Sequence, residues 1–590
     1  MKLRIPIQFY VFLTGITFCL LLFGLGEKLS FLTYSFGRIF SWTPGDVFDG
    51  SLNNWFLENN LQYFLRGGNI LDFNQIFNSN FYWPEKNVLA MSDNWILITP
   101  IYGLLRLTLS PNFAFTGIIV LSLTANLMAC FHLCRHATEN KFYRLLASLL
   151  SAFSLTLLAR ISHAQLMPAF AGVLAIDSFI DATNIRKLST KGIDKKSTLL
   201  NEKEIVISIS GFINGFIWLL LQIAMGFYQG VFFIVASGCF IVVLILNRFA
   251  FKNTKFKLKK INLIGNFSKY YFSLKISFFI FLIFFNVSLY WQYFIFTQNK
   301  AARSWGEVST QIPKFWSIWF NTLSTPGNVS FPAPVQNINF NSYTGPFWEH
   351  SMFPGYTFMV ILFLGIWFGL KGSINKKNNN RKWKVMTLSN TALLMLFVSI
   401  GFGGANPILT IWLIFWKFIP GFSAIRAVSR IGIPIVLMLS PLLAWTLSEI
   451  HNRLNKNAMF IILSLLFMLY LAGNVTKDIK RFDSTDYASI KDNAINKIET
   501  IVKEKNCKIF YMSSPDTKDW MFDRAYPQLL AMWASVKLGI PTSSGYTGNN
   551  PSQGWNHMMN ENQYKKWLSK MGVDSKAIAD TCWINGDDII

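Results

Sequence analysis

The chain has 590 residues, of which 52% are hydrophobic and only 14% are charged, and its formal net charge is +24. Soluble globular proteins carry about 25% charged residues, so this composition excludes an ordinary soluble protein and favours a membrane protein. The positive charge does not indicate a nucleic-acid-binding protein, because the basic residues lie in short runs between apolar segments, as in the cytoplasmic loops of membrane proteins. We therefore expect membrane lipids, and no nucleic acid, as partners.

The N-terminal segment starts with Met1-Lys-Leu-Arg and continues into the apolar run Ile5–Leu25. This run is longer than that of a signal peptide and lacks a small-residue cleavage site, so it is predicted to be an uncleaved first transmembrane helix. Further apolar runs along the chain approach the roughly 20 residues that cross a bilayer. The predicted spans begin near residues 6, 112, 142, 166, 205, 228, 272, 355, 385, 430 and 457.

Lys and Arg predict the orientation of these spans, because cytoplasmic loops are enriched in both. The basic stretches between spans are residues 186–203, 248–260, 371–384 and 451–456. They all face one side only if Trp95–Leu109 and Leu409–Phe418 do not cross the membrane, so we interpret both segments as interfacial or re-entrant. This leaves about eleven transmembrane helices, with the N-terminus in the cytoplasm and the C-terminal tail outside it.

The predicted topology divides the chain into a transmembrane domain, residues 1–473, and an extracytoplasmic C-terminal domain, residues 474–590. The transmembrane domain has two large outer loops, residues 27–94 and 297–355. The first outer loop contains seven acidic and four basic residues between Glu27 and Asp93. It is therefore acidic in a strongly basic protein.

The tail has the pattern of a small α/β domain. The segment Asp486–Lys505 is predicted to be an amphipathic helix, with its isoleucines and valine on one face: Ile490, Ile495, Ile498 and Val502. A strand-like run starts at Cys507, and Tyr526–Leu538 is a second predicted helix. Cys507 and Cys582 could form a disulfide if the tail is outside the cytoplasm.

Acidic residues of the first outer loop are the first candidates for chemistry. Asp46 and Asp49 follow Pro44-Gly45 and precede a predicted helix, and Asp93 precedes the interfacial segment. Carboxylates in these places can cap a helix and complement its dipole. A carboxylate near the membrane surface can also serve as a general base or a metal ligand. The local pattern leaves both interpretations open.

Five blocks in chain order resemble bacterial membrane glycosyltransferases of the GT-C class. The first block resembles the pattern "GD..D.R.N..ilEH" through Gly45-Asp46, Asp49, Asn53 and Glu58, although Ser51 and Asn59 stand where that pattern has Arg and His. The other blocks are Phe81–Arg106, Leu158–Leu166 with Arg160 and His163, Ile419–Arg430, and Gly539–Trp555 with Tyr546. The resemblance covers nearly the whole chain.

This resemblance implies a GT-C-like fold in a bacterial inner (cytoplasmic) membrane and a sugar donor carried on a polyprenyl phosphate. It also implies an essential carboxylate near the start of the first outer loop, for which we expect Asp46, with Asp49 as the nearest rival. Glu58 and Asp93 are expected to orient substrate or bind a cation. No cofactor is certain; a divalent cation is the candidate, with Asp46 and Asp93 as its ligands if one binds.

Basic residues are the candidates for binding the phosphate of the donor. Arg426 and Arg430 stand four apart, so on a helix they would share one face, and guanidinium groups bind phosphate with paired hydrogen bonds. The alternative is that they are anchors that snorkel to the membrane surface. Arg160 and His163 form a second candidate pair, and Tyr546 in the tail is a further candidate for substrate binding. His163 is otherwise a polar residue at a helix end.

The leading hypothesis is an inverting glycosyltransferase that moves a sugar to an extracytoplasmic glycan, lipid or protein. The second hypothesis is a lipid or polysaccharide transporter or flippase, which should have ionisable residues near the middle of the membrane and often halves related by a repeat. The predicted spans are rich in Phe, Leu and Ile, and no repeat stands out. The third hypothesis is a non-catalytic component of an export assembly. Neither the donor sugar nor the acceptor follows from the sequence.

Overall fold

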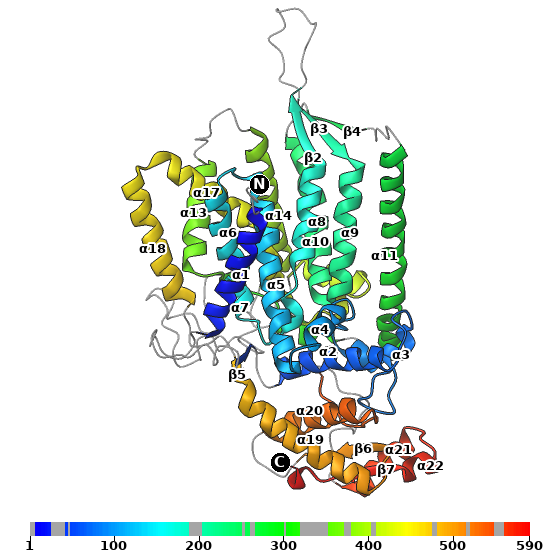
Figure 1. Cartoon of the computed structure of the whole chain (residues 1–590). Helices are drawn as coiled ribbons and strands as arrows, with labels where there is room; N and C mark the ends of the chain where they lie inside the picture. The colour runs from blue at the N-terminus through cyan, green and yellow to red at the C-terminus, as the bar shows by residue number, and fades with distance from the viewer. Residues whose placement is uncertain are drawn as a thin grey trace, which may run out of the picture.

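The apolar runs of the sequence fold as helices that stand side by side in a bundle, with a small α/β domain at one end of it (Figure 1). The computed structural model describes residues 6–24, 42–44, 48–187, 203–250, 254–259, 266–299, 303–318, 352–370, 379–402, 409–474, 481–514, 520–547 and 560–589. Asp46 lies outside the described residues, and so does most of the second outer loop.

A helix occupies each region where the sequence predicts a span. These helices are α1 (Ile7–Gly24), α5 (Pro111–Leu133), α6 (Lys141–Ala152), α8 (Phe170–Ala182), α9 (Ile209–Met225), α10 (Phe227–Ala250), α11 (Asn266–Asn299), α13 (Tyr356–Leu370), α14 (Asn379–Ser399), α16 (Gly432–Met438) with α17 (Ser440–Arg453), and α18 (Lys456–Asn474). Within the described residues, six helical segments are long and apolar enough to cross a membrane by themselves. The chain is thus consistent with a helical membrane protein, and the total of eleven spans stays a prediction.

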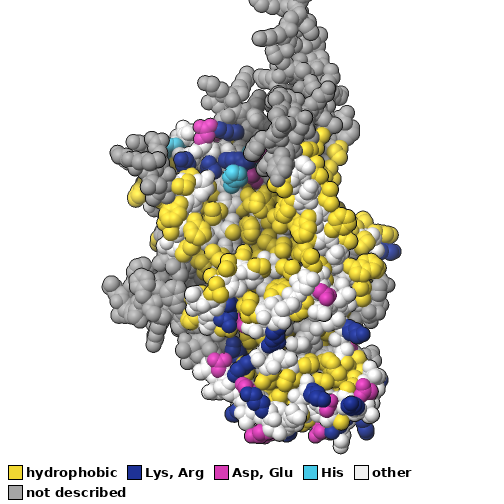
Figure 2. All heavy atoms as spheres, turned by 45° about the vertical axis from the view of Figure 1, so that its right-hand side comes forward, with side chains coloured by type: hydrophobic (Ala, Val, Ile, Leu, Met, Phe, Trp, Pro, Cys, Tyr) yellow, Lys and Arg dark blue, Asp and Glu magenta, His cyan; other side chains and the backbone are white. Residues whose placement is uncertain are grey.

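The surface of the bundle carries a broad apolar band (Figure 2). On α11 the exposed side chains include Phe281, Phe284, Val287 and Trp291. Only 22% of the most apolar part of this helix is buried within the protein. A helix that turns such side chains outward needs an apolar surrounding, since exposed apolar patches of this size are unusual in soluble proteins. The band therefore has the character of a lipid-facing surface.

Two short helices replace two of the apolar runs. The region 95–109 forms α4 (Thr99–Arg106), which has eight residues, and the region 409–418 forms α15 (Trp412–Phe418), which has seven. Helices of these lengths extend for only about 10 to 12 Å, well short of the roughly 30 Å of a bilayer core. Neither can cross a membrane, in agreement with their predicted interfacial or re-entrant character.

The two ends of the bundle differ in what they carry (Figure 1). One end carries α2 (Asp49–Leu65), α3 (Phe73–Phe77), α4 and the C-terminal domain, and we call it the domain end. The other, the basic end, carries the start of α1 and three strands in the order β2 (Thr183–Lys187), β3 (Lys203–Ser208) and β4 (Thr254–Lys259). β2 and β3 are antiparallel, and β3 and β4 are parallel. This sheet was not predicted from the sequence.

The C-terminal domain is a small α/β unit, as predicted. Its elements are β5 (Arg481–Asp483), α19 (Ser484–Glu504), β6 (Ile509–Met512), α20 (Trp520–Leu538), α21 (Glu561–Lys570), α22 (Ser575–Ala579) and β7 (Thr581–Ile584). β6 and β7 are parallel neighbours, and β5 pairs with β1 (Trp42–Pro44) of the first outer loop. The first outer loop and the tail are therefore joined by backbone hydrogen bonds.

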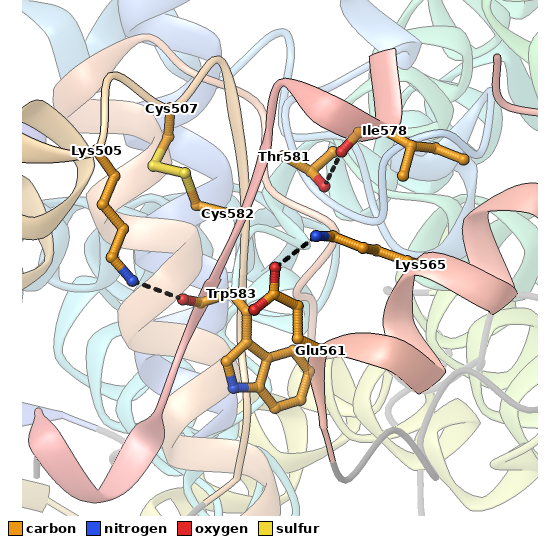
Figure 3. Close-up of a disulfide and its surroundings, with 8 residues drawn as sticks. All are labelled: Lys505, Cys507, Glu561, Lys565, Ile578, Thr581, Cys582 and Trp583. Carbon is orange, nitrogen blue, oxygen red and sulfur yellow. Dashed lines mark hydrogen bonds and ion pairs between the residues drawn. A yellow bond between two sulfur atoms is a disulfide. The ribbon is translucent and has the colours of Figure 1, made fainter. Parts of the chain in front are cut away.

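A disulfide joins Cys507 to Cys582 beside these parallel strands (Figure 3). Lys505 donates a hydrogen bond from its Nζ to the carbonyl oxygen of Trp583, 3.5 Å away, and so links the same two segments. The bond that the two tail cysteines could form is thus present. The other four cysteines, Cys19, Cys130, Cys134 and Cys239, are buried and free.

Helix α2 lies between the bundle and the C-terminal domain (Figure 1). The indole of Trp55 donates a hydrogen bond to the carbonyl of Met532 in α20, at 2.7 Å, and Arg66 donates one to the carbonyl of Val536, also at 2.7 Å. On the other side α2 contacts α4 and α5. A helix held from both sides is a rigid support for the polar side chains along it.

Candidate active site

The carboxylate of Asp49 stands at the first residue of α2, where three parts of the chain meet. Its Oδ2 is 3.4 Å from Nδ1 of His163, and Tyr546 of the C-terminal domain donates a hydrogen bond to its Oδ1 at 3.5 Å. The Asp49 side chain is 34% exposed and that of His163 is 20% exposed. The structure therefore brings together three residues that the sequence analysis selected, and it leaves their carboxylate accessible to a ligand.

The first turns of α2 are fixed by buried polar contacts. Asn53 donates a hydrogen bond to the carbonyl of Asp49 at 2.7 Å, and its Oδ1 accepts one from the indole of Trp95 at 3.1 Å. The indole of Trp533 in the C-terminal domain donates to Oγ of Ser51 at 3.1 Å. These contacts hold the backbone beneath Asp49, so the position of its carboxylate is set before a substrate arrives.

Arg160 connects this carboxylate region to the arginines near residue 430. It lies just beyond α7 (Leu155–Leu158), three residues before His163, and it is 3% exposed. Its Nη1 donates to the carbonyl of Thr156 at 3.0 Å and its Nη2 to Oγ of Ser429 at 3.2 Å. Ser429 immediately precedes Arg430, so Arg160 lies between the two predicted halves of the site.

Arg426 and Arg430 do not share a helix face, which corrects the prediction from their spacing. Gly421 is in the left-handed conformation with φ of 88°, and two short 3-10 helices, η10 (Phe422–Ala424) and η11 (Val428–Ile431), replace a continuous helix. The two arginines converge instead on Tyr228 in the first turn of α10. Its hydroxyl accepts a hydrogen bond from the backbone N–H of Arg426 at 3.2 Å, and the Arg430 guanidinium lies 5.0 Å from its ring centroid.

The exposure of these two arginines differs. Arg430 is 4% exposed, so it is a buried cation that packs on an aromatic face. The Arg426 side chain is 32% exposed, and its Nη1 is 3.6 Å from the carboxylate of Glu307 in α12 (Trp305–Ser309). Arg426 is consequently the more accessible of the two arginines, while Arg430 is a buried positive charge.

Asp93 caps a helix, but not the one that follows it in the sequence. Its Oδ1 accepts a hydrogen bond from the backbone N–H of Phe227 at 2.6 Å, so it caps α10 and not the interfacial helix that follows it in sequence. Burial raises the pKa of Asp93 to about 6, although the backbone N–H groups of α10 and the nearby charge of Arg430 oppose the increase. The carboxylate thus caps the helix turn that carries Tyr228, which contacts the Arg430 guanidinium and the backbone N–H of Arg426.

Glu58 lies about 13 Å further along α2 from Asp49 and binds residues of α4. Nε of Arg106 is 2.8 Å from its Oε2, and the hydroxyl of Tyr102 donates to the same oxygen at 2.7 Å. Burial by itself would raise the pKa of Glu58, but hydrogen bonds from Arg106, Gln62 and Tyr102 bring it below the ordinary value. This arrangement joins α2 to α4, and it does not place Glu58 beside Asp49.

Lys491 is a buried cation that sequence reasoning missed. It is 5% exposed, its Nζ lies 3.9 Å from the centroid of the Trp533 ring, and burial lowers its pKa to about 8. Ile490, which was predicted on the buried face of this helix, is instead 55% exposed. The buried face of α19 is Lys491, Ala494, Ile495, Ile498 and Val502. Lys491 lies at helical spacing with Ile495, Ile498 and Val502, so a search for a buried face that tolerated one basic residue would have found it.

The structure also bears on metal binding. Among the described residues, a group with the spacing of metal ligands is formed by His136, Asp177 and Asp181, at the basic end of the bundle. Arg135 and Lys384 contact these carboxylates, so the group is neutralised by the protein itself. At the candidate active site, Asp93 uses an oxygen to cap α10, and the cation predicted there stays a prediction.

Comparison with known proteins leaves this geometry as the main source of functional information. No family model matches the chain, and no curated protein matches its sequence.

Proposed function

We propose that the protein is an integral membrane glycosyltransferase that moves a sugar from a polyprenyl phosphate to an acceptor outside the cytoplasm. The proposal rests mainly on one arrangement: Asp49 contacts His163, the backbone N–H of His163 donates to the carbonyl of Arg160, and the Arg160 guanidinium donates to Ser429, the neighbour of Arg430 in the chain. It combines an accessible carboxylate with arginines at one end of an apolar bundle. A reaction between a lipid-phosphate donor and a polar acceptor needs both kinds of group at a membrane surface.

The proposed reaction is a single displacement at the anomeric carbon of the donor. A carboxylate at the start of α2 accepts the proton of the acceptor hydroxyl while that oxygen forms a bond to the anomeric carbon. The bond from this carbon to the phosphate oxygen breaks on the opposite face, and its electron pair leaves with the phosphate. The configuration of the sugar is inverted. No second carboxylic acid is needed, because a phosphate leaves without being protonated.

Two carboxylates are candidates for the base. The resemblance to GT-C enzymes favours Asp46, which lies outside the described residues. The geometry supports Asp49 as its rival, because His163 and Tyr546 both contact that carboxylate and α2 holds it rigidly. The other of the two would orient the acceptor, and a divalent cation, if one is used, would be bound on the same loop.

The departing phosphate would bind at Arg426. A guanidinium holds phosphate oxygens through paired charge-assisted hydrogen bonds. Arg426 is partly exposed, and its contact with Glu307 at 3.6 Å is long enough to be exchanged for a stronger one. Arg430 and Arg160 are more deeply buried and would add positive charge to the same region of the chain.

The domain end is proposed to face the outside of a bacterial inner membrane. The Cys507–Cys582 disulfide supports this orientation, since structural disulfides persist in oxidising compartments. Arg135, Arg381 and Lys384 lie at the opposite end, where the positive-inside rule would place the basic residues of short cytoplasmic loops. With α1 starting at the basic end, eleven spans would carry the chain to the domain end, where the tail lies.

The proposal is tested by incubating the purified full-length protein in lipid nanodiscs with a panel of polyprenyl-phosphate sugars. We expect one donor to be consumed, with free polyprenyl phosphate released and the transferred sugar inverted. The same donors in proteoliposomes test the transporter hypothesis. Movement of an intact donor to the other leaflet, without release of polyprenyl phosphate, would contradict the proposed reaction, as would the absence of any donor consumption.

A further inference from the structure

A polar cavity of about 300 Å³ lies at the domain end, away from Asp49. Its walls come from the second half of α2, the region of α3 and the end of α20 in the C-terminal domain. Five carboxamide side chains line it: Asn59, Gln62, Gln75, Asn78 and Asn80. The cavity is thus built by the first outer loop and the tail together, and its size is in the lower range of small-molecule sites.

The lining selects a chemical class of ligand. Each carboxamide presents both hydrogen-bond donors and an acceptor, which matches a ligand whose groups also do both. None of the described residues that line the cavity is Asp, Glu or Lys, so it is not built for a cation or an anion. The one cation, Arg66, already donates to the carbonyl of Val536. Ile76 and Val536 are the aliphatic contributions among these residues, too few for a lipid chain.

Two polar side chains in the wall make no hydrogen bond to the described residues. The Asn59 side chain is 8% exposed and bonds to none of the described residues, and Oγ of Ser79 is buried without a partner. Neighbouring amides are satisfied: Gln62 donates to Glu58, and Gln75 accepts from the hydroxyl of Tyr63. A buried polar group without a partner, such as Oγ of Ser79, costs about 1–3 kcal/mol, so a ligand hydroxyl that bonds to Ser79 is favoured, and Asn59 offers a second polar group in the same wall.

Two side chains of the cavity wall, Tyr63 and Arg66, each pack closely against a glycine. The ring of Tyr63 lies on Gly68, where an added Cβ would be 2.3 Å from Cε1 of that ring. The Arg66 guanidinium lies on Gly539, which has a positive φ of 71°. Larger residues at either position would displace a wall. The cavity is therefore preformed, which reduces the entropy that a ligand loses on binding.

We infer that this cavity binds an uncharged carbohydrate, which is the glycan portion of the acceptor. Sugar hydroxyls donate and accept hydrogen bonds in the pattern that the amide-rich wall offers. Asn59 stands ten residues from Asp49 on the same helix, a distance of about 15 Å along its axis. A glycan bound in the cavity could thus extend toward the carboxylate. The identification of the ligand as an acceptor rests on the proposed function; the carbohydrate site itself does not.

The inference is tested by measuring binding of the full-length protein in nanodiscs to an array of oligosaccharides and unglycosylated peptides. We expect binding to neutral oligosaccharides. Asn59→Leu should weaken it by about tenfold or more, the equivalent of one lost buried hydrogen bond. Asn493→Leu is the matched control, because Asn493 is exposed on α19 and does not line the cavity. Ser79→Ala, a smaller change, tests the same wall if Asn59→Leu does not fold.

Binding is measured without transfer, so the two proposals can fail separately. Asp49→Asn should retain glycan binding, because its side chain lies outside the cavity. Binding only to peptides or to charged glycans would overturn the inference, and so would neutral-glycan binding that neither Asn59→Leu nor Ser79→Ala weakens. If the protein binds glycans but consumes no donor, the carbohydrate site is supported and the proposed transferase activity is contradicted.

Discussion

The two ends of the bundle each gather carboxylates, arginines and histidines, but they use them differently. At the basic end, Asp177 is buried between Arg135, His132 and His136, and Nη1 of Arg135 is 2.8 Å from both of its carboxylate oxygens. At the domain end, Asp49 is about one-third exposed. At the basic end these residue types form a buried ion-pair cluster around Asp177. At the domain end the same residue types leave the carboxylate of Asp49 accessible to a ligand.

The comparison explains why a cluster with the spacing of metal ligands is not our candidate for chemistry. His136, Asp177 and Asp181 lie close together, but Arg135 and Lys384 occupy their oxygens. Removing a partner from such a buried group leaves an uncompensated charge. We therefore expect mutations at the basic end to change stability, and mutations at the domain end to change activity.

The largest effect on stability is expected from Asp177→Asn. The substitution removes the buried carboxylate that Arg135, His132 and His136 contact, and the loss of charged contacts at a buried group typically costs about 3–5 kcal/mol. Asp181→Asn, one turn further along α8, is the control, because Asp181 is 49% exposed and its loss should cost about 1 kcal/mol or less. Thermal denaturation in detergent measures both. Equal melting temperatures of the two variants would show that the ion pairs of Asp177 do not stabilise the fold.

Removal of the disulfide is expected to destabilise the C-terminal domain by about 2–4 kcal/mol. The double variant Cys507→Ser and Cys582→Ser should therefore be cleaved faster than the wild type in limited proteolysis, within residues 481–589. Reduction of the wild-type protein should reproduce the effect. If wild-type protein from the intact cell already carries both thiols reduced, the extracytoplasmic position of the domain would be contradicted.

Asp93 should make stability depend on pH. Its pKa in the folded protein, about 6, is above the ordinary value of about 3.9, so ionisation of Asp93 opposes folding. The contribution of protonated Asp93 to the free energy of unfolding is complete below about pH 4 and is lost as the pH rises through about 6. The free energy of unfolding differs by at most about 3 kcal/mol between these two limits. The melting temperature of the wild type relative to Asp93→Asn should therefore fall between pH 4 and 7. If the difference in melting temperature between the wild type and Asp93→Asn is constant from pH 4 to 7, Asp93 does not titrate in this range.

Arg426→Gln offers the sharpest comparison of the two ends. Arg426 and Arg381 are both 32% exposed, and each contacts one carboxylate, Glu307 at the domain end and Glu139 at the basic end. We expect Arg426→Gln to raise KM for the donor by about tenfold, because a charge-assisted bond to phosphate is lost. Arg381→Gln should not change it. Equal kinetic effects of the two variants would contradict the phosphate assignment.

The sequence predicted the local features of the fold well. The helices begin close to the predicted positions because a long apolar run in a membrane has few alternatives to a helix. The small α/β character of the tail was likewise predicted, while the sequence left open whether Cys507 and Cys582 are bonded, and the structure joins them. Asp49, His163 and Tyr546 were selected from separate blocks, and the structure places them in contact.

Contacts between distant segments were not predictable from local patterns. A cap by Asp93 on the helix that follows it was one of the two open interpretations, but Asp93 caps α10, which starts 134 residues later. Arg426 and Arg430 both contact Tyr228, the first through its backbone N–H and the second through its guanidinium. The predicted shared helix face does not form. Lys491 is buried because Trp533 of another helix covers it. Helical and strand periodicities describe which face of one element is apolar, not which second element will cover it.

The most direct test of the account is the rate at which polyprenyl phosphate is released from a matched donor when the first-loop carboxylates are changed. Asp46→Asn and Asp49→Asn are compared with Asp588→Asn, a change at an exposed carboxylate of the C-terminal domain. Loss of the general base should lower the rate by about 100-fold or more, and the larger loss identifies the base. Wild-type rates in all three variants would contradict transfer at the start of α2.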